Sequence, residues 1–174
     1  MRRLVRTITP FLVLVVFAHP ATASVPANFQ AEFTQHFGRG IGAASGPCAD
    51  AFCGSGQMVG YGDAELTIIA TSVLPASVAH CGFALTVTGT ATLALEDGST
   101  LVLNEVGTYC LPGGSLFAPG NLFVSYGNPL EISATYTIVD GSGVFAGAVG
   151  AGTNAIHQAG DTQVAVYSGT LSFG

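Results

Sequence analysis

The feature that most constrains the fold is a run of alternating residues that begins at Cys81 and ends at Cys110. Apolar side chains recur there at every second position from Phe83 to Leu95, with Gly89 as the one exception. The residues between them include four threonines, Thr86, Thr88, Thr90 and Thr92. A period of two places alternate residues on opposite faces of a β-strand, so this pattern predicts a long strand with one buried face and one wet face.

A turn inside this run sets the expected strand register. The residues Glu96-Asp97-Gly98 interrupt the alternation. We predict a three-residue loop with Gly98 in the left-handed region, because that loop places Leu93 opposite Leu101 and keeps the apolar faces together. A two-residue turn would set Leu93 beside Val102 and shift the faces of the partner strand. The run is therefore predicted to be a β-hairpin.

Similar alternation predicts six further strands, near residues 28–37, 63–73, 121–126, 130–139, 150–158 and 163–173. The links between them are too short for crossover helices, so neighbouring strands should pair antiparallel. About eight such strands can close into a small barrel. The predicted fold class is therefore all-β, an antiparallel eight-stranded β-barrel. The glycine-rich segment 38–62, after the first strand, is predicted to be a long loop pinned by a disulfide.

The first 23 residues differ in character from the rest. Arg2, Arg3 and Arg6 precede an apolar run over residues 11–18, and an Ala-x-Ala sequence ends at Ala23. This is the pattern of a secretory signal peptide, so it predicts cleavage after Ala23 and a secreted, extracellular protein. Residues 24–174 are then expected to form a single β-barrel domain.

Removal of the leader leaves a chain that has almost no cations. Residues 24–174 contain ten acidic residues and one arginine, Arg39, so their formal net charge is −9. Nucleic acids and anionic membranes attract proteins through lysine and arginine, so neither is an expected partner. Charged residues make up only 8% of the chain, which predicts a surface made largely of small, uncharged residues.

The four cysteines form an even set, which in an exported chain predicts two disulfides. Three connectivities are possible. We favour Cys48 with Cys53, which closes a small loop, and Cys81 with Cys110, which ties the start of one hairpin strand to the end of the other. A zinc site is the alternative, and it is disfavoured because the Cys-x4-Cys spacing has no matching second pair.

One segment near the C-terminus is similar to a known family. Residues 136–153 contain a strand end followed by small residues and one aromatic, at Gly141, Gly143, Phe145, Gly147, Ala148 and Gly150. This arrangement resembles the closing strands of dirigent and allene oxide cyclase-like barrels, which have a calycin-like fold. The resemblance implies a barrel whose cavity binds or transforms a small apolar ligand. The charged active-site residues of those families find no matching motif here, so none is carried over.

Glu105 is the candidate catalytic residue. In the predicted register it shares a face with Leu101, Leu103 and Tyr109 and stands opposite Gly89, which leaves room for a ligand. A carboxyl in such a place would have a raised pKa and could act as a general acid or base. The alternative is that the strand twists or bulges and that Glu105 points to water.

Four residues are candidates for ligand binding. Tyr61, Asp63 and Glu65 lie near the start of a predicted strand, where Asp63 and Glu65 share one face. Tyr109 is the fourth, on the face predicted for Glu105. The alternative is that the two acids form the solvated edge of a strand. The histidines are scattered, and no metal site or cofactor is predicted.

Two hypotheses for the function follow from these observations. The first is a secreted barrel that binds or transforms a small apolar ligand in its cavity. The second is a non-catalytic extracellular or cell-surface module that acts through the neutral, threonine-rich face, with a homo-oligomer as one form of it. Whether the protein is an enzyme stays open at this point.

Overall fold

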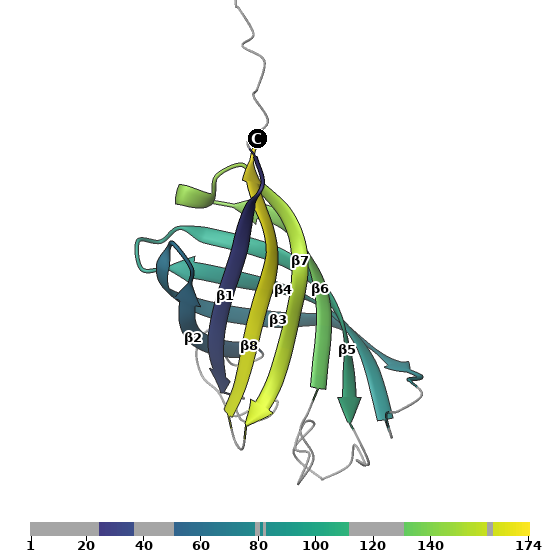
Figure 1. Ribbon diagram of the computed structural model, residues 1–174. Helices are drawn as coiled ribbons and strands as arrows, with labels where there is room; N and C mark the ends of the chain where they lie inside the picture. The colour runs from purple at the N-terminus through teal and green to yellow at the C-terminus, as the bar shows by residue number, and fades with distance from the viewer. Residues whose placement is uncertain (1–24, 37–50, 79–80, 82, 112–130, 160–161) are drawn as a thin grey trace, which may run out of the picture.

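The computed structural model describes residues 25–36, 51–78, 81, 83–111, 131–159 and 162–174. Within these residues the chain forms eight strands and one short 3-10 helix. They are β1 (Ala27–His36), β2 (Phe52–Met58), β3 (Gly62–Ala76), β4 (Phe83–Leu95), β5 (Thr100–Leu111), β6 (Glu131–Gly141), η1 (Gly143–Phe145), β7 (Ala148–Ala159) and β8 (Thr162–Phe173). Consecutive strands pair antiparallel, and β8 pairs with β1 to close the barrel (Figure 1). The predicted fold class is confirmed.

The β4–β5 hairpin has the predicted register. Leu93 pairs with Leu101, and Gly98 has a φ of 85°, in the left-handed region that glycine adopts without strain. The Leu95 amide donates a hydrogen bond of 2.9 Å to the Ser99 carbonyl, which closes the three-residue loop. The buried faces of the two strands therefore meet along their whole length.

The loop predicted over residues 38–62 is wrong in its second half, because β2 lies there, between β1 and β3. Two of its inward positions are Gly54 and Gly56, so the strand shows no apolar alternation. A Cβ at Gly56 would collide with the Glu32 carbonyl on β1, and one at Gly54 would lie 2.7 Å from the Thr34 carbonyl oxygen. The glycines thus allow a close approach of two strands. The rest of the predicted loop and the predicted strand 121–126 lie outside the described residues.

The barrel interior is filled mainly by apolar side chains. The least exposed of the large ones are Phe33, Met58, Leu66, Leu93, Leu101, Leu103, Phe145 and Tyr167. The rings of Phe33 and Tyr167 meet edge to face, with centroids 5.9 Å apart. At the end of the barrel that carries η1, Phe145 is completely buried and contacts the Tyr61 ring. Packed side chains therefore fill this end of the barrel.

A disulfide joins Cys81 to Cys110, as predicted, with a Cα–Cα distance of 5.3 Å. It ties the segment before β4 to the end of β5, where Ala84 pairs with Cys110. Cys48 lies outside the described residues, so its pairing with Cys53 stays a prediction, as does the signal peptide. None of the described segments forms a helix long and apolar enough to cross a membrane.

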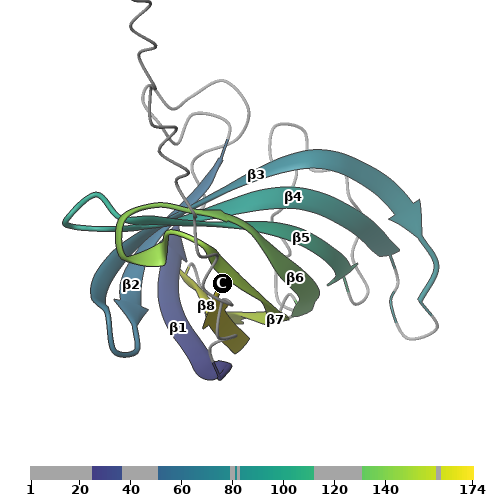
Figure 2. The ribbon, with the colours of Figure 1, turned by 90° about the horizontal axis from the view of Figure 1, so that it is seen from above.

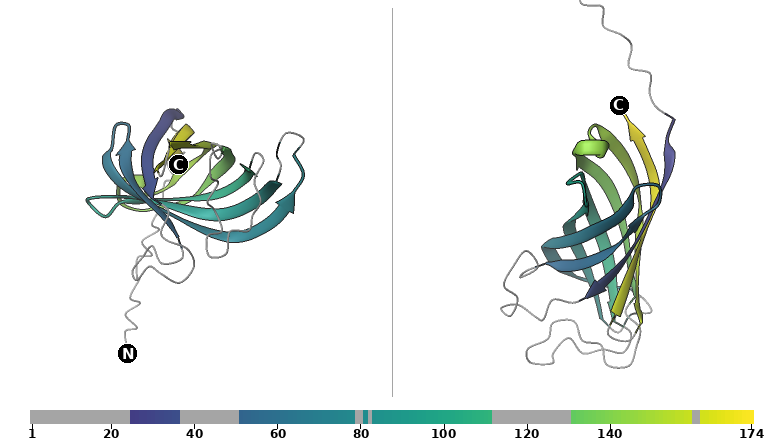
Figure 3. Two further views of the ribbon diagram at one scale, coloured as in Figure 1. Left: turned by 90° about the horizontal axis from the view of Figure 1, so that it is seen from below. Right: turned by 90° about the vertical axis from the view of Figure 1, so that its left-hand side faces the viewer.

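The strands β3 and β4 extend beyond the rest of the barrel at the end opposite η1, as Figures 2 and 3 show from above and from below. The β3–β4 register shifts between Ala70 and Ser72, where β3 carries one extra residue. Beyond this bulge, Val73 pairs with Val87 and therefore faces inward, yet it is 44% exposed. Pro75, two residues further along β3, also faces inward and is exposed. We call the exposed inner face of these strand ends, at Val73 and Pro75, the mouth of the barrel.

Candidate functional site

Glu105 lies in the middle of β5 with its side chain inside the barrel. It pairs with Gly89 on β4 and with Tyr136 on β6, and it is 7% exposed. The β4–β5 pairing is regular here, so the side chain does not turn to water. Glu105 is the only acidic residue among the buried side chains of the described segments.

A small recess lies beside the carboxyl, and Gly89 and Gly107 are among its walls. Neighbouring strands approach both glycines closely: a Cβ at Gly89 would lie 2.8 Å from the Ile69 carbonyl oxygen, and one at Gly107 would lie 2.7 Å from the Ala134 Cβ. The recess has a volume of about 20 Å³, which is room for about one water molecule. Its walls are Ile68, Val87, Gly89, Glu105, Gly107, Tyr109, Ile132, Ala134, Asn154 and Ile156.

Two polar side chains from the opposite wall approach Glu105. Asn154 on β7 is 1% exposed, and its Nδ2 donates a hydrogen bond of 3.4 Å to Glu105 Oε1. The Tyr167 hydroxyl, on β8, also approaches the carboxyl, without a geometry that completes a hydrogen bond. No described residue bonds to Asn154 Oδ1 or to the Tyr136 and Tyr167 hydroxyls. The cluster therefore keeps free hydrogen-bonding capacity inside an apolar barrel.

Burial raises the pKa of Glu105 from 4.5 to about 7, against the opposing effect of Tyr167 and Asn154, which favour the charged form. Burial and the nearby Glu105 charge raise the pKa of Tyr109, and likewise that of Tyr136, to about 12. The tyrosines thus stay protonated at neutral pH, whereas Glu105 is divided between its two forms. A carboxyl with this pKa can both donate and accept a proton near neutral pH.

Apolar residues follow this recess along β4 in the direction of the mouth. Val87 is a wall of the recess and pairs with Val73 on the extended part of β3. Two residues further out, Leu85 pairs with Pro75, which is exposed. Aliphatic side chains thus lie between the mouth and Glu105 along β4.

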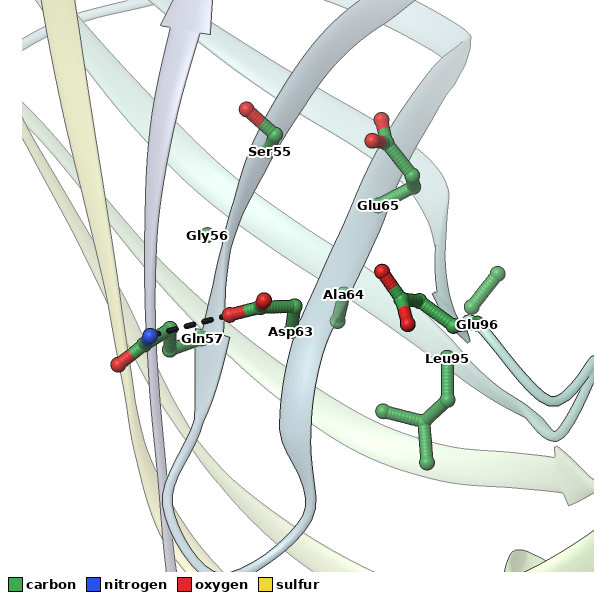
Figure 4. A pocket seen from close by; sticks show the side chains of 9 residues that line it. Ser55, Gly56, Gln57, Asp63, Ala64, Glu65, Leu95 and Glu96 are labelled. Atoms are coloured by element: carbon green, nitrogen blue, oxygen red, sulfur yellow. Dashed lines mark hydrogen bonds between the residues drawn. The ribbon is translucent and has the colours of Figure 1, made fainter.

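The four predicted ligand-binding residues lie in three separate places. Asp63 and Glu65 share the outer face of β3, as expected, and line a surface hollow of about 510 Å³ over β2, β3 and the end of β4 (Figure 4). Tyr61 packs against Phe145 instead, with ring centroids 4.8 Å apart. Tyr109 lies inside the barrel, beside Glu105.

Three acidic residues line the outer hollow, but their carboxylates do not converge on one point. Gln57 Nε2 donates a hydrogen bond of 3.0 Å to Asp63 Oδ1, and Glu65 and Glu96 extend from neighbouring strand ends (Figure 4). All three carboxylates belong to exposed residues. Among the described residues, no group of His, Cys, Asp and Glu could hold a metal ion. The interior cluster is therefore the better candidate site.

Sequence reasoning missed Asn154, Tyr136 and Tyr167, which complete that cluster. Tyr136 fits because Gly152 and Gly169 form a cross-strand pair, and a Cβ at either would lie 2.5 Å from the Tyr136 hydroxyl. The sequence signal that could have found these residues is a polar residue or a glycine at an inward position of an otherwise apolar strand face. That signal does not say which residues meet across a barrel.

Comparison with known proteins adds no relative: the chain matches no protein-family model, no curated protein and no solved structure. The fold and the geometry around Glu105 are thus the basis for a functional proposal.

Proposed function

We propose that this protein is a secreted barrel that binds a small, largely apolar molecule at the mouth formed by β3 and β4, with one polar group of the molecule against Glu105. The observation that carries the proposal is the buried carboxyl of Glu105, of pKa about 7, beside apolar residues that follow β4 toward the mouth. Apolar walls with a few convergent polar groups and a perturbed pKa are typical of ligand sites.

The size of the recess limits what reaches Glu105. A volume of about 20 Å³ accepts one polar group, such as a hydroxyl or a carbonyl, while the apolar body of the ligand would lie on Val73, Pro75 and Leu85. Protonated Glu105 would donate a hydrogen bond or a proton to that group, and ionised Glu105 would accept one. The site thus supports acid–base chemistry on the bound molecule.

Two further features support the proposal. The resemblance of residues 136–153 to dirigent and allene oxide cyclase-like barrels implies a fold of this kind, and we propose a distant kinship on that ground. The Cys81–Cys110 disulfide is consistent with export, because such bonds persist in oxidising compartments.

The test is a titration with cyclohexanol, an apolar ring with one hydroxyl, followed by NMR of 13C-labelled isoleucine and valine methyl groups. We expect shifts at Val87, Ile132 and Ile156, and an affinity that changes as the pH passes about 7. Glu105→Gln should remove this pH dependence, while Glu65→Gln, the same change on an exposed position of β3, should keep it. Unchanged methyl signals, or an unaltered pH dependence in Glu105→Gln, would refute the proposal.

A second candidate is an interaction module that acts through the outer face of β3, β4 and β5. Thr90 is flanked by Ile69, and Thr88 is paired with Val106, and both aliphatic residues are at least half exposed. This uncharged surface favours contact with another neutral surface. Sedimentation tests it: self-association that Thr90→Lys abolishes would support this function, and a monomer at high concentration would count against it.

A further inference from the structure

Two glutamines face the barrel interior where β1 ends and β8 begins. Gln35 on β1 pairs directly with Gln163 on β8, and each is only 2% exposed. Their nearest neighbours on the same inner face, Phe33 and Ala165, are completely buried. Two glutamine side chains thus start from paired positions of the inner face, where the alternation calls for apolar residues.

Both amides have an unused donor group. No described residue accepts a hydrogen bond from Nε2 of Gln35 or from Nε2 of Gln163. Burying an N–H group without a partner costs free energy, and native proteins contain few such groups. Here two of them occur on one cross-strand pair, which points to an acceptor from outside the described chain.

The surroundings provide space for the Gln35 side chain. It lies across Gly54 on β2, where an added Cβ would be 3.1 Å from Gln35 Cγ and 2.7 Å from the Thr34 carbonyl oxygen. Any larger residue at this position would push the amide out of place. The glycine therefore contributes to holding a polar side chain in the interior.

We propose that the Gln35 and Gln163 amides form a subsite that binds the carbonyl oxygen of a neutral small molecule, such as a ketone, an ester or an amide. Two N–H donors suit an oxygen acceptor. A neutral carbonyl is favoured over a carboxylate, because burying an anion costs far more free energy than burying a neutral polar group. A neutral carbonyl accepts both bonds without that cost.

This subsite is separate from the Glu105 recess. Gln35 and Gln163 are not among the residues that line the recess. Along β8, the inward residue Ala165, which pairs with Ile156, lies between Gln163 and Tyr167. The subsite therefore goes beyond the function proposed for Glu105 and can be tested independently of it.

The experiment is 15N NMR of the glutamine side-chain amides in the full mature chain, with cyclohexanone as the probe and cyclohexene as the carbonyl-free control. We expect cyclohexanone to shift the amide signals of Gln35 and Gln163 and to leave the exposed Gln30 and Gln57 unchanged. Absence of a shift at both buried amides, or equal shifts with cyclohexene, would overturn the proposal.

Methionine variants provide the second measurement, because methionine keeps the length of glutamine without its donors. Gln163→Met and Gln35→Met should each lower the affinity for cyclohexanone at least tenfold and raise the melting temperature of the free protein. Gln30→Met, on the outer face of β1, is the matched control and should do neither. A lower melting temperature in both buried variants would show that the amides are satisfied within the protein, and this would overturn the proposal.

Glu105→Gln separates this proposal from the function proposed above. If Glu105→Gln retains the pH dependence of cyclohexanol binding while the amide shifts with cyclohexanone persist, the function proposed for Glu105 fails and the subsite stands. If Glu105→Gln abolishes the amide shifts, the two sites are one, and the claim of a separate subsite fails.

Discussion

Replacing Glu105 by Gln should change how the stability of this protein depends on pH. The pKa of Glu105 is about 7 in the folded chain, against 4.5 for an ordinary glutamate. The folded state therefore holds the proton more tightly than the unfolded state. Between pH 4.5 and 7 the unfolded chain ionises Glu105 while the folded chain keeps it neutral, so stability falls as the pH rises through this window.

The size of the effect follows from the two pKa values. Each unit of difference between the folded and unfolded pKa values corresponds to about 1.36 kcal/mol, so the full difference changes the free energy of unfolding by about 3 kcal/mol. Glu105→Gln has the same shape and no charge, so it should lack this loss. For a domain of this size, about 3 kcal/mol corresponds to roughly 6–12 °C in melting temperature. The variant should thus match the wild type near pH 4.5 and be clearly more stable at pH 8.

Thermal and guanidinium unfolding from pH 4.5 to pH 8, followed by circular dichroism, measures this difference. Glu65→Gln is the matched control, because it removes an exposed carboxylate from β3 and should follow the wild type throughout. Contributions from histidines are common to all three proteins and cancel in the comparison. Parallel stability curves for wild type and Glu105→Gln would refute the reasoning about the buried carboxyl.

Two further predictions concern the fold. The double variant Cys81→Ala/Cys110→Ala should lose about 3–4 kcal/mol of stability, as expected for a cross-link that spans 29 residues, and denaturant titration measures it; an unchanged midpoint would contradict this. Gly56→Ala should destabilise the barrel by at least about 2 kcal/mol, because its Cβ would collide with the β1 backbone. Ser55→Ala, its exposed neighbour on β2, is the control, and equal melting temperatures for the two variants would contradict the close approach of the strands.

Local sequence patterns were sufficient to predict the strands in which apolar and polar residues alternate regularly. The alternation from Phe83 to Leu95, together with Gly98, determined the hairpin register, and that register correctly placed Glu105 opposite Gly89. The Cys81–Cys110 pair was favoured because it joins the start of one hairpin strand to the end of the other, and the structure contains it. These features depend on interactions between residues close in sequence, which a period of two and a turn glycine encode directly.

The strand β2 was not predictable in the same way. Its inward positions include Gly54 and Gly56, which carry no apolar side chain, and it is a strand because β1 and β3 lie on either side of it. In a sequence, glycines at such positions indicate a loop. Its role becomes visible only when the neighbouring backbone is in place.

Strand periodicity and turn chemistry are local, so the all-β class and the central hairpin could be predicted from the sequence, whereas the orientation of Glu105, inward or toward water, was settled by the structure. Only the tertiary structure decided that Asn154 and Tyr167 approach Glu105, since barrel closure brings β7 and β8 across from β5. The raised pKa of Glu105 has the same origin, because desolvation depends on every wall of the barrel at once.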